Sequence, residues 1–128
     1  MTSFFDAVAK AAPASALTWI SDEATALQAA KAQRKPLLID FAADWCLPCK
    51  ELELKTFAEP RVSAELGRFV LLRIDATEST DAVDALKARY GAETLPTVLV
   101  KDSSGQTVLK ITEFTTAERL LPILQKTR

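Results

Sequence analysis

The chain has 128 residues, which is enough for one domain with a sizeable core. Hydrophobic residues make up 48% of it and the formal net charge is −1, which argues against a disordered chain and against a surface built to bind nucleic acid. It contains no histidine and two cysteines, so histidine-assisted nucleophiles and histidine metal ligands are excluded and thiol chemistry is left.

Residues 1–16 are expected to form an extension ahead of the main domain, which is expected over residues 17–128. Apolar residues recur at helical spacing from Phe4 to Ala12, which predicts a short amphipathic helix over residues 3–12. The chain lacks the basic start and long apolar stretch of a signal peptide, and no apolar run is long enough to cross a membrane. We therefore expect a cytosolic chain, a mature form, or a domain of a larger precursor.

The main domain is predicted to begin with a strand, a helix and a second strand. Residues 17–20 favour a short strand, and Ser21 is predicted to cap a helix that runs to about Gln33. Pro36 breaks that helix. Residues 37–41 are a nearly continuous apolar run, typical of a strand that is buried on both faces.

The middle of the chain is predicted to be mostly helical. After a loop over residues 42–45, the pattern is helical over residues 48–57. Pro60 interrupts it, and a second helical piece follows over residues 61–66. Residues 69–74 are a further apolar run and predict another buried strand.

The last part of the main domain is predicted to add a helix and two strands. Thr80 is a candidate cap for a helix over residues 81–90, which Gly91 would close. Two strands, over residues 97–100 and 107–111, flank a turn and predict a hairpin.

A final helix is predicted to begin at Thr115, which has capping-box spacing with Glu118. Pro122 should bend or split it. Strands that alternate with helices and end in a hairpin predict an α/β fold, in which helices flank a mixed central sheet.

The two cysteines, Cys46 and Cys49, stand three residues apart. Three readings other than redox chemistry compete for such a pair. A zinc site needs about four ligands, and the two cysteines supply only two of them. A structural disulfide that closes so short a loop would stabilise the fold little, and a chance pair of buried thiols is odd beside Pro48 and Lys50. The position between a buried strand and a helix favours a redox pair.

Several stretches carry a resemblance to a known family. A Cys-x-x-Cys between a buried strand and a helix is the redox motif of the thioredoxin fold, and Leu95-Pro96-Thr97 resembles the cis-proline that faces the cysteines in it. Residues 43–53, followed by residues 56–62, resemble the C-terminal periplasmic domain of the thiol:disulfide interchange protein DsbD family. The resemblance covers roughly residues 17–128.

This resemblance implies a thioredoxin fold and a thiol-disulfide oxidoreductase without cofactor or metal. It implies a protein-disulfide reductase in the periplasm that relays electrons through Cys46 and Cys49 to disulfide-bearing proteins. The donor would be a membrane-embedded cysteine pair. We expect a monomer that neither binds nucleic acid nor inserts into the membrane. Two alternatives stay open: a free-standing general thioredoxin-like reductase, and a redox-inactive binding module.

The two cysteines are expected to have different roles. Cys46 is the candidate nucleophile, because unpaired N–H groups and the dipole at a helix N-terminus favour a thiolate. Cys49 lies about one turn further in, is expected to be more buried, and should resolve the mixed disulfide. Leu47 and Pro48 set the rigidity of the turn between them and belong to the surface expected to meet the substrate.

Two carboxylates are candidates for proton handling. By resemblance, Asp40 is the buried acid that exchanges a proton with Cys49, and burial would raise its pKa; the alternative is a solvated aspartate at a strand end. Thioredoxins often place a lysine beside this acid, and the matching position here is expected to be Leu71, which would leave Asp40 without a cation. By resemblance, Glu53 raises the pKa of the thiols; the alternative is an ordinary exposed helix acid.

The remaining candidates would form the surface that meets the partner protein. Trp45 is expected to shield the disulfide and to join the docking surface, with simple packing as the alternative. A cis peptide at Pro96 would let the backbone of Leu95 pair with an extended partner segment. Glu113 stands where the family usually has glycine, and it is expected to narrow partner choice or to raise the thiol pKa.

Overall fold

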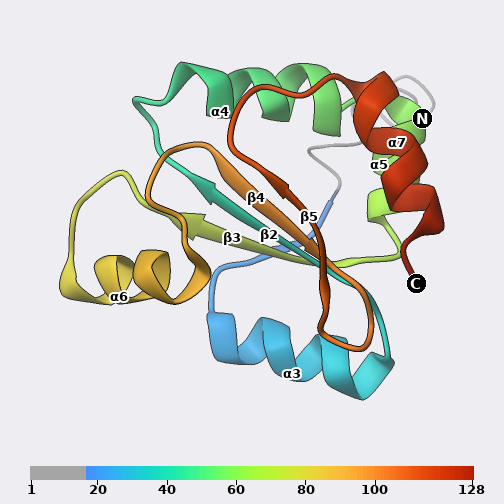
Figure 1. Ribbon diagram of the computed structural model, residues 1–128, viewed down its shortest axis with the longest axis horizontal. Helices are drawn as coiled ribbons and strands as arrows, with labels where there is room; N and C mark the ends of the chain where they lie inside the picture. Colours follow the sequence, from blue (N-terminus) through green and yellow to red (C-terminus); the bar gives the residue numbers. More distant parts are fainter. Residues whose placement is uncertain (1–16) are drawn as a thin grey trace, which may run out of the picture.

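A computed structural model describes residues 17–128 (Figure 1). The extension over residues 1–16, with the helix expected over residues 3–12, lies outside the described residues. The elements are β1 (Trp19–Ile20), α3 (Glu23–Gln33), β2 (Leu37–Ala42), α4 (Leu47–Glu51), η1 (Leu52–Phe57), α5 (Pro60–Leu66), β3 (Val70–Asp75), α6 (Asp81–Tyr90), β4 (Thr97–Lys101), β5 (Thr107–Ile111) and α7 (Ala117–Lys126). No helix within the described range is long and apolar enough to cross a membrane.

The five strands form one mixed sheet in the order β1-β3-β2-β4-β5. Strands β1, β3 and β2 run parallel to one another, whereas β4 runs antiparallel to β2 and β5 antiparallel to β4. This arrangement confirms the predicted α/β fold with a mixed central sheet. Strand β2, which leads into the cysteine motif, is the middle strand.

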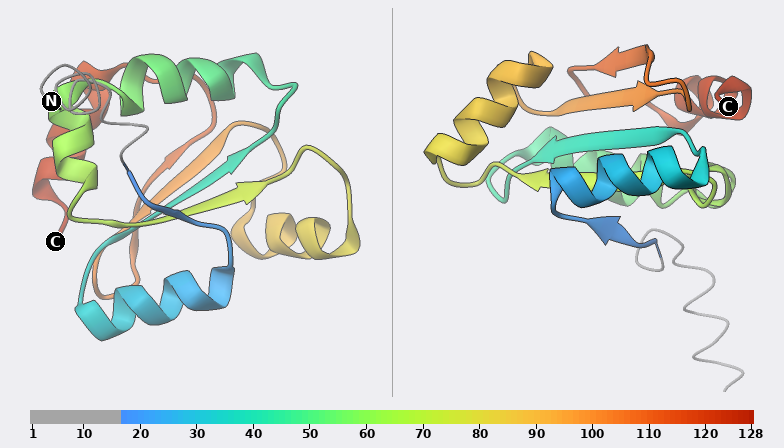
Figure 2. Two further views of the ribbon diagram at one scale, coloured as in Figure 1. Left: turned by 180° about the vertical axis from the view of Figure 1, so that it is seen from behind. Right: turned by 90° about the horizontal axis from the view of Figure 1, so that it is seen from below.

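Helices cover both faces of the sheet. In Figures 1 and 2, α4, α5 and α7 lie on one side of it and α3 and α6 lie on the other. Each side has its own hydrophobic core: Leu52, Phe57 and Leu120 belong to the first, and Ala26 and Ala92 belong to the second. The sheet therefore separates two packed layers, and only the first contains the helix that carries the cysteines.

Strand β2 contributes to both layers because its side chains alternate between the two faces. Leu37, Ile39 and Phe41 belong to the core beneath α3, whereas Leu38 belongs to the core on the α4 side. The same alternation turns the next even-numbered residue, Asp40, toward the α4 side. A single strand thus places a carboxylate on the face that the cysteine helix covers.

Helix α3 is capped one residue later than predicted. Asp22, rather than Ser21, is the N-cap, and its carboxylate accepts the backbone N–H of Thr25 at 2.9 Å. The carboxylate provides a charged acceptor at the positive end of the helix, where an anion is favoured. The helix ends at Arg34, which adopts a left-handed conformation with φ 54°.

The single helix expected over residues 48–57 is wrong in detail. The chain makes about one turn of α-helix in α4 and then widens into the π-helical segment η1. Leu52, Thr56 and Phe57 are the buried residues of that segment. The hydroxyl of Thr56 donates to the carbonyl of Thr115 at 2.5 Å, so the wider turn is attached to the loop that precedes α7.

Helices α5 and α6 begin and end close to the predicted residues. Pro60 is the first residue of α5 rather than a break before it, which suits a residue that has no N–H to leave unpaired. Thr80 caps α6 as predicted, and its hydroxyl accepts the N–H of Val83 at 3.2 Å. Gly91 closes that helix with φ 65°, a conformation that glycine adopts without strain.

Helix α7 differs from the prediction at its start. The cap is Thr116 rather than Thr115, and its hydroxyl accepts the N–H of Arg119 at 3.3 Å. Pro122 neither splits nor ends the helix, which continues to Lys126. An N–H at this position would have reached back to the first turn, where the surface is exposed.

Candidate active site

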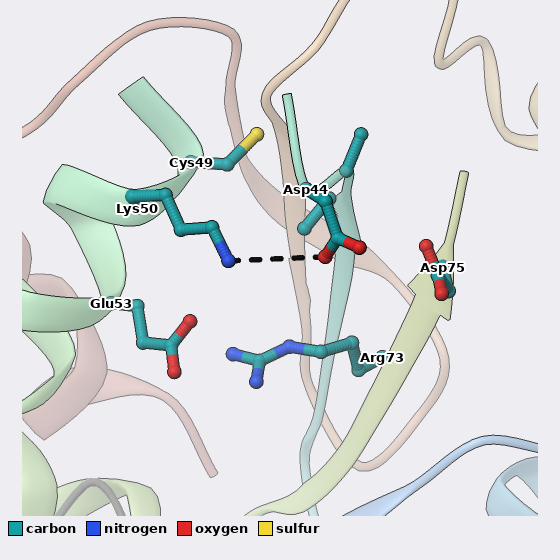
Figure 3. A pocket seen from close by; sticks show the side chains of 8 residues that line it. Asp44, Cys49, Lys50, Glu53, Arg73 and Asp75 are labelled. Carbon is teal, nitrogen blue, oxygen red and sulfur yellow. Dashed lines mark ion pairs between the residues drawn. The ribbon is translucent and has the colours of Figure 1, made fainter. Parts of the chain in front are cut away.

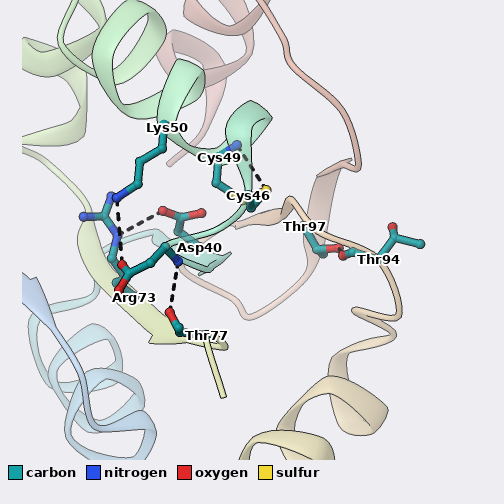
Figure 4. Close-up of a disulfide and its surroundings, with 9 residues drawn as sticks. Asp40, Cys46, Cys49, Lys50, Arg73, Thr77, Thr94 and Thr97 are labelled. Carbon is teal, nitrogen blue, oxygen red and sulfur yellow. Dashed lines mark hydrogen bonds and ion pairs between the residues drawn. A yellow bond between two sulfur atoms is a disulfide. The ribbon is translucent and has the colours of Figure 1, made fainter. Parts of the chain in front are cut away.

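The cysteine pair lies at the start of α4, as the sequence predicts. Cys46 and Cys49 form a disulfide, with their Cα atoms 5.3 Å apart (Figure 4). Cys46 is the N-cap of α4, and its sulfur accepts the backbone N–H of Cys49 at 3.3 Å. A thiolate at this sulfur would therefore be stabilised by a helix N–H group as well as by the helix dipole.

The expected difference in burial between the two cysteines is wrong for the disulfide. The exposed fraction is 4% for Cys46 and 6% for Cys49. Ala43 belongs to the same apolar cluster and Leu95 packs against that cluster, so residues of the loops on either side cover the cysteine pair. The distinction between nucleophile and resolving thiol must come from position on the helix, where Cys46 holds the cap.

The loop that faces the cysteines contains the expected cis peptide bond between Leu95 and Pro96. Pro96 is buried and Leu95 is half-buried against the cysteine cluster. The hydroxyl of Thr97 donates to the carbonyl of Thr94 at 2.6 Å, which closes the loop on itself (Figure 4). The loop is thereby held against the disulfide from the side of β4.

Trp45 lies beside the disulfide but is largely open to solvent, with 66% of its surface exposed. Its indole N–H donates to the carbonyl of Thr77 at 2.9 Å, and the hydroxyl of Thr77 accepts the backbone N–H of Asp44 at 3.0 Å. Two hydrogen bonds to one residue of the β3–α6 loop thus fix the segment before Cys46. Simple packing does not explain so exposed an aromatic ring.

Leu47 and Pro48 are the first two residues of α4. Leu47 is 69% exposed, and Pro48 is half-buried between the two cysteines of the motif. Together with Trp45 they place apolar surface next to the sulfur atoms.

Asp40 has a cationic partner, contrary to expectation. The Nε of Arg73 donates to Oδ2 of Asp40 at 3.0 Å (Figure 4), and the Asp40 side chain is 5% exposed. The parallel register pairs Asp40 with Arg73, whereas Leu71 pairs with Leu38. Leu71 and Arg73 are two residues apart and so face the same side of the sheet, which is why alternation alone could not tell them apart.

The burial of Asp40 changes its acidity. Desolvation raises the pKa of this carboxyl to about 6, although the neighbouring Arg73 guanidinium acts in the opposite direction. The negative charge of Glu53 adds to the rise. The solvated strand-end alternative for Asp40 is therefore wrong, and the group can exchange a proton near neutral pH.

A hollow of about 200 Å³ opens behind the disulfide (Figure 3). Its lining includes one sulfur-bearing residue and five charged residues: Cys49, Asp44, Lys50, Glu53, Arg73 and Asp75. The Nζ of Lys50 lies 3.9 Å from Oδ1 of Asp44, at the exposed rim. Solvent can therefore reach Cys49 from the side on which these charges gather.

Glu53 belongs to this hollow and is half-buried, so it is not an ordinary exposed helix acid. Figure 3 shows its carboxylate and the Arg73 guanidinium pointing toward one another across the hollow. It reaches this position from η1, about two turns beyond Cys46. The structure thus places Glu53, Arg73 and Cys49 around one space.

Glu113 lies apart from this hollow. It is exposed after β5, and its carbonyl accepts the hydroxyl of Thr115 at 3.2 Å. It borders a separate shallow groove together with residues of β5 and α7, among them Arg119. Glu113 neither lines the hollow nor belongs to the cysteine cluster.

The residues of the site that were not predicted include Arg73, Thr77 and Trp19, as well as Asp44, Lys50 and Asp75 of the hollow. Aligning the predicted strands, residues 37–41 and 69–74, from their first residues would have placed Leu72 opposite Asp40, whereas the observed register is one residue further and places Arg73 there. Nothing in the sequence indicated Thr77. The ring of Trp19 lies 3.9 Å from Cζ of Arg73, a contact between segments more than fifty residues apart.

Comparisons with known proteins agree with this geometry. The family model described as thioredoxin-like matches residues 18–103. The thiol:disulfide interchange protein DsbD of Yersinia pestis (strain Pestoides F) is 38% identical over 100 residues, which is 77% of this chain and 17% of that protein. DsbD of Salmonella typhi is 44% identical over 77 residues, 60% of this chain and 14% of that protein. The chain thus matches about one sixth of the length of these relatives.

Solved structures extend the comparison to the fold. The C-terminal domain of Neisseria meningitidis DsbD in the oxidised form is 30% identical, with a TM-score of 0.71, and the match covers 87% of this chain and all of that one. A thioredoxin from Thermus thermophilus is 22% identical with a TM-score of 0.72, and covers 86% of this chain and 85% of its own. The second similarity concerns the fold alone.

Proposed function

Since the chain belongs to the thioredoxin-like family, among the C-terminal domains of thiol:disulfide interchange proteins, we propose that it is a protein-disulfide reductase that passes electrons to partner proteins. Thiol–disulfide exchange is the chemistry of this family, and Cys46 and Cys49 occupy the position of its redox pair. The proposal concerns direction and partners: the dithiol form donates two electrons, and the acceptors are disulfide-bearing proteins.

The first step uses Cys46. Its thiolate attacks one sulfur of the partner's disulfide, so the partner's S–S bond breaks, one partner sulfur leaves as a thiolate, and a mixed disulfide forms. The N-cap position supports this role, because the Cys46 sulfur already accepts the N–H of Cys49. The leaving thiolate takes up a proton from solvent.

The second step uses Cys49 and Asp40. Cys49 gives its proton to the Asp40 carboxylate and attacks the Cys46 sulfur, so the mixed disulfide breaks, the partner's second sulfur leaves as a thiolate that takes up a proton from solvent, and the partner is fully reduced. The chain ends as the disulfide described above, having given up two electrons and one proton, which Asp40 later returns to solvent, while the two protons of the reduced partner come from solvent. A second dithiol must then reduce it, and we propose a membrane-embedded cysteine pair for that donor.

Burial of Asp40 beneath the helix that carries the disulfide supports this proposal most. The carboxyl is 5% exposed and its pKa is raised to about 6. A binding module without redox activity has no use for such a group, since burying a carboxylate costs stability. A carboxylate that accepts a proton from a thiol does need such burial, because the pKa of the carboxyl must lie near the working pH.

The partner would dock on the exposed surface around the disulfide. We propose that Trp45 and Leu47 meet apolar side chains beside the partner's cystine, with Pro48 between them. The backbone of Leu95, preceding cis-Pro96, would pair with an extended strand of the partner. Glu113, which is exposed after β5, would restrict which partners fit.

The DsbD relatives also suggest where the chain works. We propose a periplasmic domain, with residues 17–128 as the reductase and residues 1–16 as an extension ahead of it. Electron flow outward from a membrane donor would then keep the domain reduced in an oxidising compartment.

A trapping experiment tests the reaction. Cys49→Ser retains the nucleophile and lacks the resolving thiol, so it should accumulate a mixed disulfide with a model substrate such as oxidised insulin. Cys46→Ser is the matched control and should accumulate none. The proposal would be wrong if the reduced chain left the substrate oxidised and Cys49→Ser trapped nothing.

Two further measurements separate the related functions. A reduction potential near or below about −200 mV would support a reductant, whereas one near about −120 mV would indicate an oxidase. Rapid reduction of insulin with thioredoxin reductase as electron source would favour a general thioredoxin-like reductase over a dedicated relay.

A further inference from the structure

Trp19 lies at the edge of the sheet and has no role in the exchange reaction as described so far. It is one of the two residues of β1 and pairs in parallel register with Leu71 of β3. Its ring packs into the core on the α4 side of the sheet, 6.0 Å from the ring of Phe57 at the end of η1. The ring therefore connects the first strand to the π-helical segment that follows the cysteine helix.

The other neighbour of the Trp19 ring is the Arg73 guanidinium, whose Cζ lies 3.9 Å from the ring centroid. At this distance a guanidinium is attracted to the negative face of an indole. The same guanidinium donates from Nε to Oδ2 of Asp40 at 3.0 Å. Arg73 is thus held between an aromatic ring on one strand and a buried carboxylate on another.

The Arg73 side chain can adopt other positions if its contact with the Trp19 ring is lost. Its side chain is 27% exposed and lines the hollow behind Cys49. The Glu53 carboxylate faces it from the opposite wall (Figure 3). Without the ring, the long side chain of Arg73 can turn toward Glu53 or toward solvent and away from Asp40.

We propose that Trp19 is a positioning residue for the exchange site: it holds Arg73 against Asp40 and so sets how readily Asp40 accepts the proton of Cys49. This inference rests on the proposed function, in which Asp40 is the proton acceptor. Trp19 acts only through Arg73, because it contacts neither the sulfurs nor the carboxylate in the hydrogen bonds and packing described above.

The groups that face Asp40 come from several elements. Arg73 from β3 and Glu53 from η1 act on its carboxyl, and the hollow that these two residues line is also lined by Cys49 and Lys50 from α4, Asp44 after β2 and Asp75 at the end of β3. Arg73 is the one that forms an ion pair with Asp40. A change in the position of Arg73 should therefore shift the titration midpoint of Asp40 more than a change to a charged residue at the rim of the hollow.

The direct test follows Asp40 itself by carboxyl ¹³C NMR titration of the oxidised protein. Trp19→Leu should move the titration midpoint of Asp40 upward by about half a pH unit or more, because the carboxylate loses part of its cation. Trp19→Phe retains a ring and should restore most of the original midpoint. Trp19→Met is a second ring-free variant, in case Trp19→Leu does not fold.

The same Trp19 variant made in an Arg73→Met protein distinguishes the positioning of Arg73 from a general loosening of the fold. In an Arg73→Met protein, which has no guanidinium to hold, Trp19→Leu should leave the Asp40 midpoint where it is. A shift of equal size in both backgrounds, or no shift in either ring-free variant with Arg73 present, would overturn the inference. Reduced stability in all Trp19 variants is expected and does not bear on this comparison.

The titration needs no partner protein, so it can fail independently of the proposed function. If wild-type protein exchanges disulfides but the Asp40 titration midpoint is unchanged in the Trp19 variants, only this inference is wrong. If the midpoint responds through Arg73 but no mixed disulfide forms, Trp19 does position Arg73 against Asp40, and the proposed exchange reaction is what is wrong. If both the proposed function and this inference are right, the pH midpoint for attack of Cys49 on the mixed disulfide should move in the same direction as the Asp40 midpoint.

Discussion

The Nε of Arg73 and Oδ2 of Asp40 are 3.0 Å apart, on adjacent parallel strands and on the face that the cysteine helix covers. Ion pairing of this kind ordinarily lowers the pKa of an aspartate. Here desolvation outweighs it, and the pKa of Asp40 rises to about 6. The carboxyl is therefore mostly ionised at pH 7 and still basic enough to take a proton from a thiol.

Asp40→Asn should stabilise the oxidised protein at neutral pH. The pKa of the folded state, about 6, lies above the ordinary value of 3.8, so the folded state binds this proton more tightly than the unfolded state does. The contribution of Asp40 to the free energy of unfolding is thus greatest below pH 4 and falls as the pH rises through 6. At pH 7.5 we expect Asp40→Asn to gain on the order of 2–3 kcal/mol in urea denaturation.

The same comparison at pH 3.5 should show almost no difference, because wild-type Asp40 is then protonated. Asp44→Asn serves as control: Asp44 is an exposed acid at the rim of the same hollow, and its change should be a few tenths of a kcal/mol. A stabilisation by Asp40→Asn that is equal at both pH values would contradict the assignment.

Asp40→Asn should also slow the reaction at its second step. Without a proton acceptor, Cys49 attacks the mixed disulfide more slowly, by about 100-fold at pH 7 if general base catalysis has its usual size. Rapid acid quenching and mass spectrometry should then find the mixed disulfide with Cys46 accumulating. If the variant releases its partner as fast as wild-type protein, Asp40 is not the acceptor.

Glu53→Gln should lower the titration midpoint of Asp40, since the negative charge of Glu53 raises the pKa of that carboxyl. The measurement is the carboxyl NMR titration of the oxidised protein. Glu51→Gln is the matched control, because Glu51 lies on the same helical stretch but pairs with Lys55 at 3.4 Å and does not line the hollow. An upward shift in Glu53→Gln, or equal shifts in both variants, would count against this role.

Trp45→Phe tests the surface beside the disulfide. The change keeps a large aromatic group and removes the indole N–H that donates to the carbonyl of Thr77. We expect about 1 kcal/mol of lost stability, typical of one hydrogen bond. Exchange with a protein partner should weaken mainly in kcat/KM, whereas reaction with a small disulfide should stay close to wild type. Equal losses with both substrates would argue that Trp45 acts on the sulfurs rather than on docking.

Glu113→Gly tests the departure from the usual glycine. Because Glu113 lies outside the hollow, we expect partner kinetics to change and the pKa of Cys46 to stay the same. Alkylation rates against pH report the thiol, and competition between two protein substrates reports partner choice. A clear shift of the thiol pKa would instead support an electrostatic effect on the cysteines.

The sequence was sufficient for the elements whose causes are local. The apolar run of β2, the cysteines at the start of α4 and the cap at Thr80 depend on residues within a few positions of one another, whereas the cis bond before Pro96 was expected from the resemblance to the thioredoxin fold. Thr116 capping instead of Thr115 is an error of one residue between two equally suitable hydroxyls.

The features that could not be predicted depend on contacts between distant segments. Parallel strands are not joined by a tight turn, so nothing local fixes the register that brings Arg73 rather than Leu71 beside Asp40. The π-helical turn is stabilised partly by Thr56 bonding to Thr115, and the position of Trp19 over Arg73 depends on β1 joining the sheet at its edge.

Strand β2 is bonded to β3 on one edge and to β4 on the other, with Asp40 paired on both sides. Amides in such a strand exchange with deuterium only when the whole sheet opens, so fraying cannot bring water to this carboxyl. A proton taken from Cys49 can then leave by the hollow behind the disulfide, whose lining includes neither Trp45 nor Leu47 of the proposed docking surface. The acceptor could thus return its proton to solvent while the partner is still bound, so that release of the proton and release of the partner need not follow a fixed order.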